Sequence, residues 1–237
     1  MIRFHRADLI GLQEVYGYQL DHLRSALPEY EIILGAPLAD IQDVPAYNPI
    51  LFRKGRLMLV RSGHFFLADT PDVARKCWNA NLVRGVSWAE LKDIKTSKTF
   101  FFYNTHFDYF SRFSREMSAQ LLRLKIEEIG GSRPYIAAGD YNLFPSLGGP
   151  ETLSLLTDDT LPGKPLVDAQ DLSQHGHHGP TGSWSGFREA GQPGIKPDFL
   201  FVDPSVIVLT HGILADTFDG LFPSDHLPVI ADLILPL

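Results

Sequence analysis

Asp140 and Asn142 close a short apolar segment in a way that suits holding a reacting water. Residues 135–138 are aromatic, aliphatic or small, too few for a helix, and run into Gly139-Asp140-Tyr141-Asn142. Because side chains alternate along a strand, residues 140 and 142 would share one face. A carboxylate can accept a proton from a water whose orientation a neighbouring amide fixes. Asp and Asn also end strands simply as turn formers, so this segment alone leaves both interpretations open.

Other apolar runs also begin or end in an acid or an imidazole, which adds these residues: Glu14, His106, Asp198, and Asp225 with His226. Strand ends on one rim of a layered sheet protein converge, so we expect these side chains to meet Asp140 in one place.

The residue types in this set point to phosphate chemistry. Glu14, Asp140 and Asp225 offer hard oxygen ligands without any cysteine, which favours Mg²⁺ or Mn²⁺ over zinc. His106 and His226 have no paired nucleophilic serine, and they fit the stabilisation of charged phosphoryl oxygens. The set therefore predicts metal-assisted hydrolysis of a phosphate ester.

Short apolar runs separated by turns predict many strands and few helices. Expected strands cover residues 9–12, 32–34, 50–53, 56–60, 64–68, 83–94, 99–103, 135–139, 198–202, 206–209 and 227–235. Expected helices, with apolar residues at helical spacing, cover residues 20–27, 114–129 and 153–156. Residues 35–49 and 158–197 are rich in Gly and Pro and are expected to be loops.

Some finer expectations depend on local patterns. Lys54-Gly55 and the polar residues 95–98 each predict a hairpin between the flanking strands. The consecutive aromatics at residues 100–103 indicate a strand buried on both faces. The helix over 114–129 is expected to turn these side chains inward: Met117, Leu121, Leu124 and Ile129.

The order of elements favours an α/β fold of the α+β type, in which two largely antiparallel sheets pack face to face with helices outside. No segment reads as a linker, so residues 1–237 are expected to form a single domain. With 44% hydrophobic residues, a chain of this length can bury an ample core. Its single cysteine, Cys77, excludes an internal disulfide.

The formal net charge of −7, from 21 basic and 28 acidic residues, argues against a general binder of duplex nucleic acid, which needs a basic surface. No apolar run reaches the length of a membrane span, and no signal peptide precedes Met1. As given, the chain is expected to be cytoplasmic with no membrane partner. A signal peptide encoded upstream of Met1 would place it outside the cytoplasm.

Six motifs, in order, resemble the endonuclease/exonuclease/phosphatase superfamily, whose DNase I-like fold is shared by nucleases, inositol phosphatases and deadenylases. The motifs are Leu12-Gln13-Glu14-Val15, Arg84-Gly85 with Trp88, Asn104-Thr105-His106, Gly139-Asp140-Tyr141-Asn142, Asp198-Phe199-Leu200-Phe201-Val202 and Ser224-Asp225-His226-Leu227-Pro228-Val229. Each motif is weak alone, but together they span nearly the whole chain. The resemblance, which is to small bacterial-type members, implies a four-layer α/β/β/α sandwich and dependence on Mg²⁺ or Mn²⁺.

The resemblance implies a role for each acid or amide near the water. Glu14 resembles the carboxylate that binds the divalent metal, with Asp225 as a further ligand. Asp140 would orient or deprotonate the attacking water, and Asn142 would hold the water or the phosphate.

It also implies that both histidines contact the phosphate. His226 would contact the scissile phosphate, oriented and charged by Asp198, since an imidazole paired with a carboxylate stays cationic to higher pH. His106 would donate a second hydrogen bond to the phosphate oxygens.

Two positions of the family pattern look absent. The superfamily opens with a strand carrying an asparagine that helps to seat metal and phosphate, whereas no Asn precedes Glu14 here. Bacterial members often carry a glutamate just before the Asn-Pro-Ile strand, where this chain has Ala46 and no acid nearer than Asp43. We therefore expect the single domain to lack the first strand, and His106 to lack an acidic partner.

Arg84 and Trp184 are the expected substrate-binding residues, each with an alternative. Arg84 can clamp a phosphate or pair with a core acid. Trp184, together with Phe187, can stack on a substrate or simply cover the sheet. A further cluster, His175, His177 and His178, is spaced irregularly among glycines and is expected to be a solvated loop.

The leading hypothesis is a divalent-metal-dependent phosphoesterase, a phosphodiesterase or phosphatase, that works by in-line attack of an activated water. Its partner would be a phosphate-ester substrate, with nucleic acid among the candidates. The acidic balance favours a small or single-stranded phosphate compound over duplex DNA. The alternatives are a nuclease of the same family on DNA or RNA, and a binding protein of this fold with weakened catalysis. These patterns do not encode the substrate or the oligomeric state.

Overall fold

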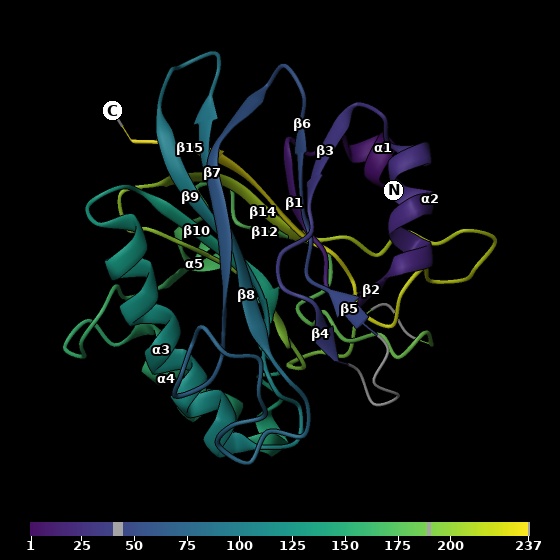
Figure 1. Ribbon diagram of the computed structural model, residues 1–237. Helices are drawn as coiled ribbons and strands as arrows, with labels where there is room; N and C mark the ends of the chain where they lie inside the picture. Colours follow the sequence, from purple (N-terminus) through teal and green to yellow (C-terminus); the bar gives the residue numbers. More distant parts are fainter. Residues whose placement is uncertain (40–44, 189–190, 237) are drawn as a thin grey trace.

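The computed structural model describes residues 1–39, 45–188 and 191–236. Figure 1 shows two β-layers with helices on their outer faces. The loop expected over 35–49 falls partly outside the described residues, at 40–44. Its described parts include two short strands, β4 (Leu38–Ala39) and β5 (Pro45–Tyr47).

The larger sheet has six strands in the order β11-β13-β10-β9-β8-β7. Their bounds are β7 (Leu57–Phe66), β8 (Gly85–Asp93), β9 (Thr99–His106), β10 (Tyr135–Asp140), β11 (Val167–Asp168) and β13 (Asp198–Val202). Only β9 and β10 run parallel among these pairs. In that register Asp140 lies opposite His106, and on its other side opposite Asp198. The sheet itself therefore brings three candidate site residues together.

The aromatic run in β9 joins two cores. Phe101 and Tyr103 pack in one cluster with Leu122 of α3 (Arg112–Gly130). Phe100 and Phe102 point to the opposite face and pack in a second cluster. Because successive side chains alternate across a strand, one run of aromatics serves both faces of the sheet. The expected burial on both faces is confirmed.

Shorter strands make up the second β-layer. They form three three-stranded sheets, in the orders β1-β6-β3, β12-β14-β15 and β2-β5-β4. The remaining bounds are β1 (Leu9–Gly11), β2 (Val15–Tyr16), β3 (Tyr30–Ile33), β6 (Ile50–Arg53), β12 (His177–His178), β14 (Ile207–Ile213) and β15 (Val229–Ile234). Ile50 of β6 and Val208 of β14 join the cluster that holds Phe100 and Phe102, so this layer covers the second face of the large sheet.

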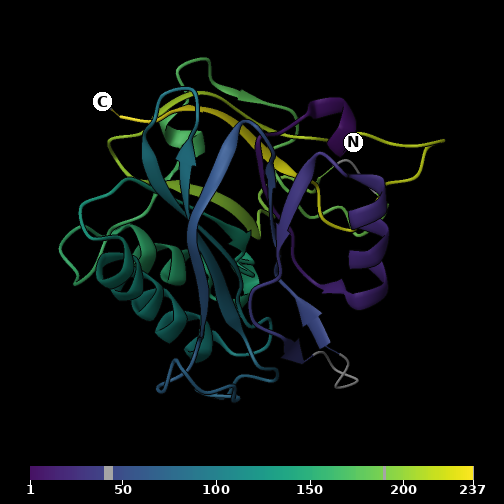
Figure 2. The same ribbon diagram turned by 45° about the horizontal axis from the view of Figure 1, so that its top comes forward.

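Helices cover both outer faces, as Figures 1 and 2 show. α3 and α4 (Gly149–Thr157) pack on the large sheet, while α1 (Ile2–His5) and α2 (Gly17–Ala26) lie on the β1-β6-β3 side. The connections include the 3₁₀ turn η1 (Pro145–Leu147) and the short helix α5 (Ala169–Leu172). The predicted sandwich of two sheets between outer helices is confirmed. No described helix is long and apolar enough to cross a bilayer.

One of the two expected hairpins is wrong. β8 and β9 pair as expected, but β6 pairs with β1 and β3 whereas β7 pairs with β8. The chain therefore changes sheets at residues 54–56. β7 also runs unbroken through residues 57–66, merging two expected strands. A turn signal records a local reversal but not which strand becomes the partner.

The inward face of α3 also differs from the expected one. Leu124 is 44% exposed, whereas Leu122 and Ile126 are fully buried. Arg115 and Arg123 are buried on the same face, where their guanidinium groups donate to backbone carbonyls and not to acids. Because an arginine can be buried this way, apolar spacing alone does not give the face.

Candidate active site

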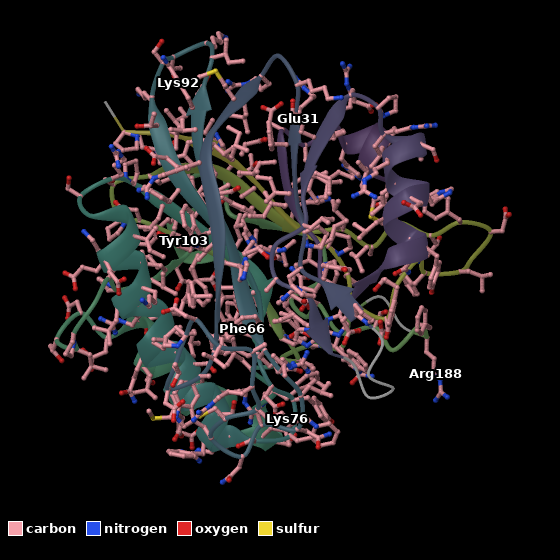
Figure 3. All side chains as sticks on the ribbon, in the orientation of Figure 1. Glu31, Phe66, Lys76, Lys92, Tyr103 and Arg188 are labelled. Atoms are coloured by element: carbon pink, nitrogen blue, oxygen red, sulfur yellow. The ribbon has the colours of Figure 1, made fainter. Side chains whose placement is uncertain are left out.

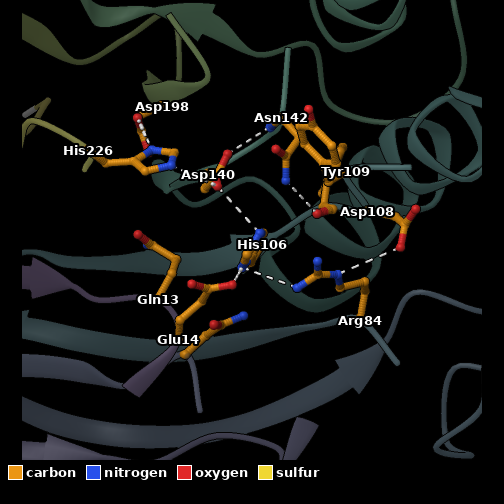
Figure 4. A network of polar contacts seen from close by, with 12 residues as sticks. Gln13, Glu14, Arg84, His106, Asp108, Tyr109, Asp140, Asn142, Asp198 and His226 are labelled. Carbon is orange, nitrogen blue, oxygen red and sulfur yellow. Dashed lines mark hydrogen bonds and ion pairs between the residues drawn. The ribbon is translucent and has the colours of Figure 1, made fainter. Parts of the chain in front are cut away.

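Asp140 is the last residue of β10, and its carboxylate lies between two histidines (Figure 4). Its Oδ2 is 3.3 Å from His106 Nε2 and 3.9 Å from His226 Nε2. His106 arrives from the parallel strand β9, and His226 from the segment that leads into β15. Asp140 is only 6% exposed. A single buried carboxylate oxygen is thus flanked by two imidazole nitrogens.

Asn142 fixes the other oxygen of Asp140. Its backbone N–H donates to Asp140 Oδ1 at 2.8 Å, and its Nδ2 donates to the Phe107 carbonyl at 2.9 Å. The strand has already ended at Asp140, and Asn142 has a left-handed φ of 52°, which Asn tolerates well. The expected pairing of the two residues is therefore present, but strand alternation is the wrong reason for it.

His226 is held by Asp198. Its Nδ1 is 2.8 Å from Asp198 Oδ2, and Ser183 Oγ donates to the same oxygen at 2.6 Å. Burial lowers the pKa of His226, but the hydrogen bond and charge of Asp198, with the charges of Asp140 and Asp225, outweigh it and raise the pKa to about 9. His226 is therefore an imidazolium at neutral pH, with Nε2–H toward Asp140.

His106 is held in the opposite state. Arg84 places a guanidinium nitrogen 3.2 Å from His106 Nδ1. A guanidinium only donates, so Nδ1 must accept and the ring proton must sit on Nε2, which faces Asp140. Burial, the charge of Arg84 and that of His226 hold the pKa of His106 well below its usual range. His106 is therefore a neutral imidazole.

Arg84 forms an ion pair with a core acid, Asp108. It is 8% exposed, and its Nε is 3.9 Å from Asp108 Oδ2 and has no hydrogen-bond partner. Asp108 is fully buried and accepts the backbone N–H groups of Asn81, Phe110 and Ser111. Asp108 is thus the turn residue at the entry to α3, and Arg84 links it to His106.

Glu14 lies on the side of Asp140 that His106 occupies. Its carboxylate is 67% exposed, with Oε1 3.8 Å from His106 Nδ1, and its φ is 56°. The preceding residue anchors it, because Gln13 donates to Asn104 Oδ1 at 2.7 Å. Ala46, where the family pattern has an acid, is buried in β5 opposite Tyr16. Asp43 lies outside the described residues. Glu14 is thus the acid found near the Nδ1 of His106.

Over the described ranges 1–39, 45–188 and 191–236, the group with three ligand atoms within 4.8 Å of one another is Asp140, Asp198 and His226. Asp198 and His226 bind each other there at 2.8 Å, so a cation would have to break that bond. The group does not include the expected ligands Glu14 and Asp225, whose assignment stays a prediction. Carboxylate oxygens without thiols nonetheless fit a hard divalent cation.

Trp184 lies beside the site. Its ring packs edge to face on His226, with centroids 5.0 Å apart, and on Phe144 at 5.7 Å. Nothing in the sequence distinguishes its neighbour Ser183, which holds Asp198, from an ordinary loop serine. The expected solvated loop at 175–178 is corrected, since His177 lies in β12 with its Nδ1 2.9 Å from His211 Nδ1.

Comparison with known proteins connects this geometry to a family. The model of the Endonuclease/Exonuclease/phosphatase family matches residues 1–226. A solved endonuclease/exonuclease/phosphatase from Bacteroides vulgatus is 35% identical, with a TM-score of 0.86, over 99% of this chain and 87% of that one. No curated protein sequence matches the chain significantly.

Further solved structures have the same fold. A mannosyl-6-phosphatase from Bacteroides thetaiotaomicron VPI-5482 is 30% identical, with a TM-score of 0.86, over 99% of this chain and 88% of that one. The human Nocturnin catalytic domain, with bound sulfate, has a TM-score of 0.74 at 21% identity, over 99% of this chain and 83% of that one. The likeness to Nocturnin concerns the fold alone.

Proposed function

Because the chain belongs to the endonuclease/exonuclease/phosphatase family, we propose that it is a divalent-metal-dependent phosphoesterase in which Asp140 activates the attacking water. One observation carries the proposal: the buried Oδ2 of Asp140 faces the Nε2 atoms of a charged and a neutral histidine, at 3.9 Å and 3.3 Å. A water held by this oxygen would lie where both imidazoles can reach the phosphate that it attacks.

Asp140 is suited to act as the base. Burial and the negative charge of Asp198 raise its pKa, which His226 and Arg84 only partly counteract. A general base works best when its pKa lies near the working pH. Asn142 fixes Oδ1 and leaves Oδ2 to take the proton of the water, and the second N–H of its amide can hold the water or a phosphate oxygen.

Two imidazole donors face the same space. His226 offers a charged Nε2–H and His106 a neutral Nε2–H, while Arg84 holds His106 from behind through Nδ1. Charge that develops on the phosphoryl oxygens during in-line attack would be shared between these donors. Arg84 pairs with Asp108 and holds His106, and its charge would add to the positive field at the phosphate.

Glu14 and Asp225 are the residues that would hold the metal. When bound, Mg²⁺ or Mn²⁺ would polarise a phosphoryl oxygen as a Lewis acid. Asp225 also raises the pKa of His226, so its charge serves the neighbouring imidazole as well.

The substrate that this chain favours is a small phosphate ester, and in particular a phosphomonoester. The support is the net charge of −7 and the 30% identity with a bacterial mannosyl-6-phosphatase along nearly the whole chain. An extended nucleic acid would need a basic surface to neutralise its phosphates.

Hydrolysis of p-nitrophenyl phosphate and of bis-p-nitrophenyl phosphate, with Mg²⁺ or Mn²⁺ and with a chelator, tests the proposal. Asp140→Asn keeps the size of the side chain and removes the base, so its rate should fall by about 10²- to 10⁴-fold. Asp203→Asn, at the far end of β13, is the matched control and should keep the rate. Background rates in both Asp140→Asn and the unaltered protein would leave a binding protein of this fold. Nicking of supercoiled plasmid without monoesterase activity would favour the nuclease.

A further inference from the structure

A row of aromatic rings leads away from His226, and we call Trp184, Phe144, Tyr109 and Phe110 the aromatic row. Trp184 packs on His226 with centroids 5.0 Å apart, Phe144 on Trp184 at 5.7 Å, Tyr109 on Phe144 at 5.7 Å, and Phe110 on Tyr109 at 5.2 Å. Neighbouring rings meet edge to face, at angles from 76° to 90°. The row is therefore continuous and starts at the candidate phosphate-binding imidazolium.

The loops that carry the row also carry the site. Tyr109 and Phe110 follow His106 at the end of β9, and Phe144 follows Asp140 at the end of β10. Trp184 comes from the loop before β13, next to the serine that holds Asp198. The aromatic row thus lies along the edge of the large sheet at which β9 and β10 end, next to Asp140.

These rings are not part of the core. None of the four belongs to the apolar clusters formed by the described residues. Tyr109 is 44% exposed and Phe110 61% exposed. Single exposed aromatics are common and need no explanation, but a contiguous set that touches a candidate catalytic residue is typical of a ligand surface.

The charges around the row limit what can lie on it. Its three loops, residues 107–111, 141–148 and 179–197, carry two cations, Arg188 and Lys196. Lys196 is bound to Asp168 at 2.6 Å, and Arg188 points outward from the molecule in Figure 3. Arg112, which packs on Gly148, is paired with Glu116 and Glu151. Among the described residues of these loops, the row therefore offers apolar faces but no cation directed at a second phosphate, which each further nucleotide of a strand would bring.

From this arrangement, and resting on the proposed function, we propose that the aromatic row is the subsite for the organic part of the substrate, an uncharged ring that carries a single phosphate. The phosphate lies against His226 and His106, and the apolar face of the ring packs on Trp184, Phe144 and Tyr109. A sugar phosphate and a nucleoside monophosphate both have this chemistry, and a nucleic acid strand does not.

Calorimetric binding to the Asp140→Asn protein with Mg²⁺ tests the row without relying on turnover. The probes are a hexose phosphate, a nucleoside monophosphate, the ring-free glycerol phosphate and a short single-stranded oligonucleotide. We expect at least one ring phosphate to bind more tightly than glycerol phosphate. Tyr109→Ala should weaken the binding of that ring phosphate by at least about fivefold and leave the binding of glycerol phosphate unchanged. Phe4→Ala, an aromatic that is 80% exposed on α1, is the matched control and should change neither.

The outcomes separate the two proposals. Which ring phosphate binds more tightly identifies the ring. Equal binding of ring and ring-free phosphates, preference for the oligonucleotide, or equal weakening of all probes by Tyr109→Ala would overturn the ring subsite. If the unaltered protein and Asp140→Asn hydrolyse the substrate at the same rate while the preference for a ring phosphate persists, the proposed reaction fails and the subsite stands.

Discussion

Asp140 has a histidine on each flank, His226 on one and His106 on the other, and the two histidines differ in protonation. On one flank, Asp198 accepts the Nδ1–H of His226, and the imidazole is charged. On the other, Arg84 donates to Nδ1 of His106, and the imidazole is neutral. Both rings turn Nε2 toward the same carboxylate oxygen. The partner on the far nitrogen, and not the histidine itself, therefore decides what each ring supplies.

This difference has a consequence for the electrostatics of the site. One cation against Asp140 favours its ionised form, whereas two imidazolium rings beside Arg84 would repel one another within a buried space. A neutral His106 still donates a hydrogen bond at no such cost. The missing acid at Ala46 is then compatible with a working site, because Arg84 selects the tautomer that an acid partner would not.

Of the two flanks, the charged one should show the larger effect when it is broken, at Asp198. Asp198→Asn removes the charge that keeps His226 protonated, so kcat/KM near pH 8 should fall by about 10²-fold. In the unaltered protein the rate should decline only as pH rises through about 9, where His226 loses its proton. In the variant that decline should move toward the ordinary histidine value of 6.5. A pH–rate profile checks this, and an unmoved alkaline limb would contradict it.

The same pairing should appear in stability. The pKa of His226 is raised in the folded state, so its stabilising contribution is complete below pH 6.5 and is lost as pH rises through about 9. Denaturant unfolding of the unaltered protein and of Asp198→Asn should therefore differ most below pH 6.5 and converge above pH 9. A difference that stays constant across this window would show that Asp198 does not act through His226.

A smaller effect is expected when the neutral flank is broken at Arg84. Arg84→Met keeps the bulk of the side chain but removes both the positive charge and the donor to Nδ1. His106 should then become easier to protonate, and kcat/KM should fall by about tenfold, the value of one charge-assisted hydrogen bond. Arg84→Lys keeps the charge and should recover part of the loss. Unchanged kinetics in Arg84→Met would mean that Arg84 neither sets the tautomer nor adds to the positive field at the phosphate.

The smallest catalytic effect is expected from the buried arginines of α3, which form a matched pair. Arg115 donates to the carbonyls of Asp108, Tyr109 and Leu147, beside the neutral flank, whereas Arg123 holds the remote loop at 155–163. Each variant, Arg115→Met and Arg123→Met, should lose about 2 to 4 kcal/mol of stability by leaving buried carbonyls unpaired. Arg115→Met alone should also lower kcat, by a few fold. Equal kinetics in the two variants would remove Arg115 from the positioning of the site.

Much of this fold could be predicted from local pattern. The aromatic run of β9 and the apolar segment of β10 give strands because so many large side chains can be buried only on a sheet. The partner of a strand is a different matter. Lys54-Gly55 predicts a turn, yet the strands on either side of it belong to different sheets. The partner of a strand is decided by how the whole domain packs and not by the turn.

The site divides in the same way. The pairing of Asp198 with His226 is one that the resemblance to the superfamily implies, and the two side chains do meet. The contact of Arg84 with His106 crosses from the loop before β8 to β9, and no spacing in the sequence announces it. Glu14 and Asp225 remain predicted metal ligands. A metal site is defined by ligand atoms that lie close together, and a sequence motif does not show whether they do.

Imidazole ¹⁵N chemical shifts of His226 and His106, followed by NMR across a pH titration of the metal-free protein, test the central claim most directly. The account predicts that His226 stays doubly protonated until about pH 9. It also predicts that His106 remains neutral, with its proton on Nε2, from well below the usual histidine pKa of 6.5 upward. Two histidines that titrate together near 6.5, or a His106 that carries its proton on Nδ1, would contradict the two-flank account.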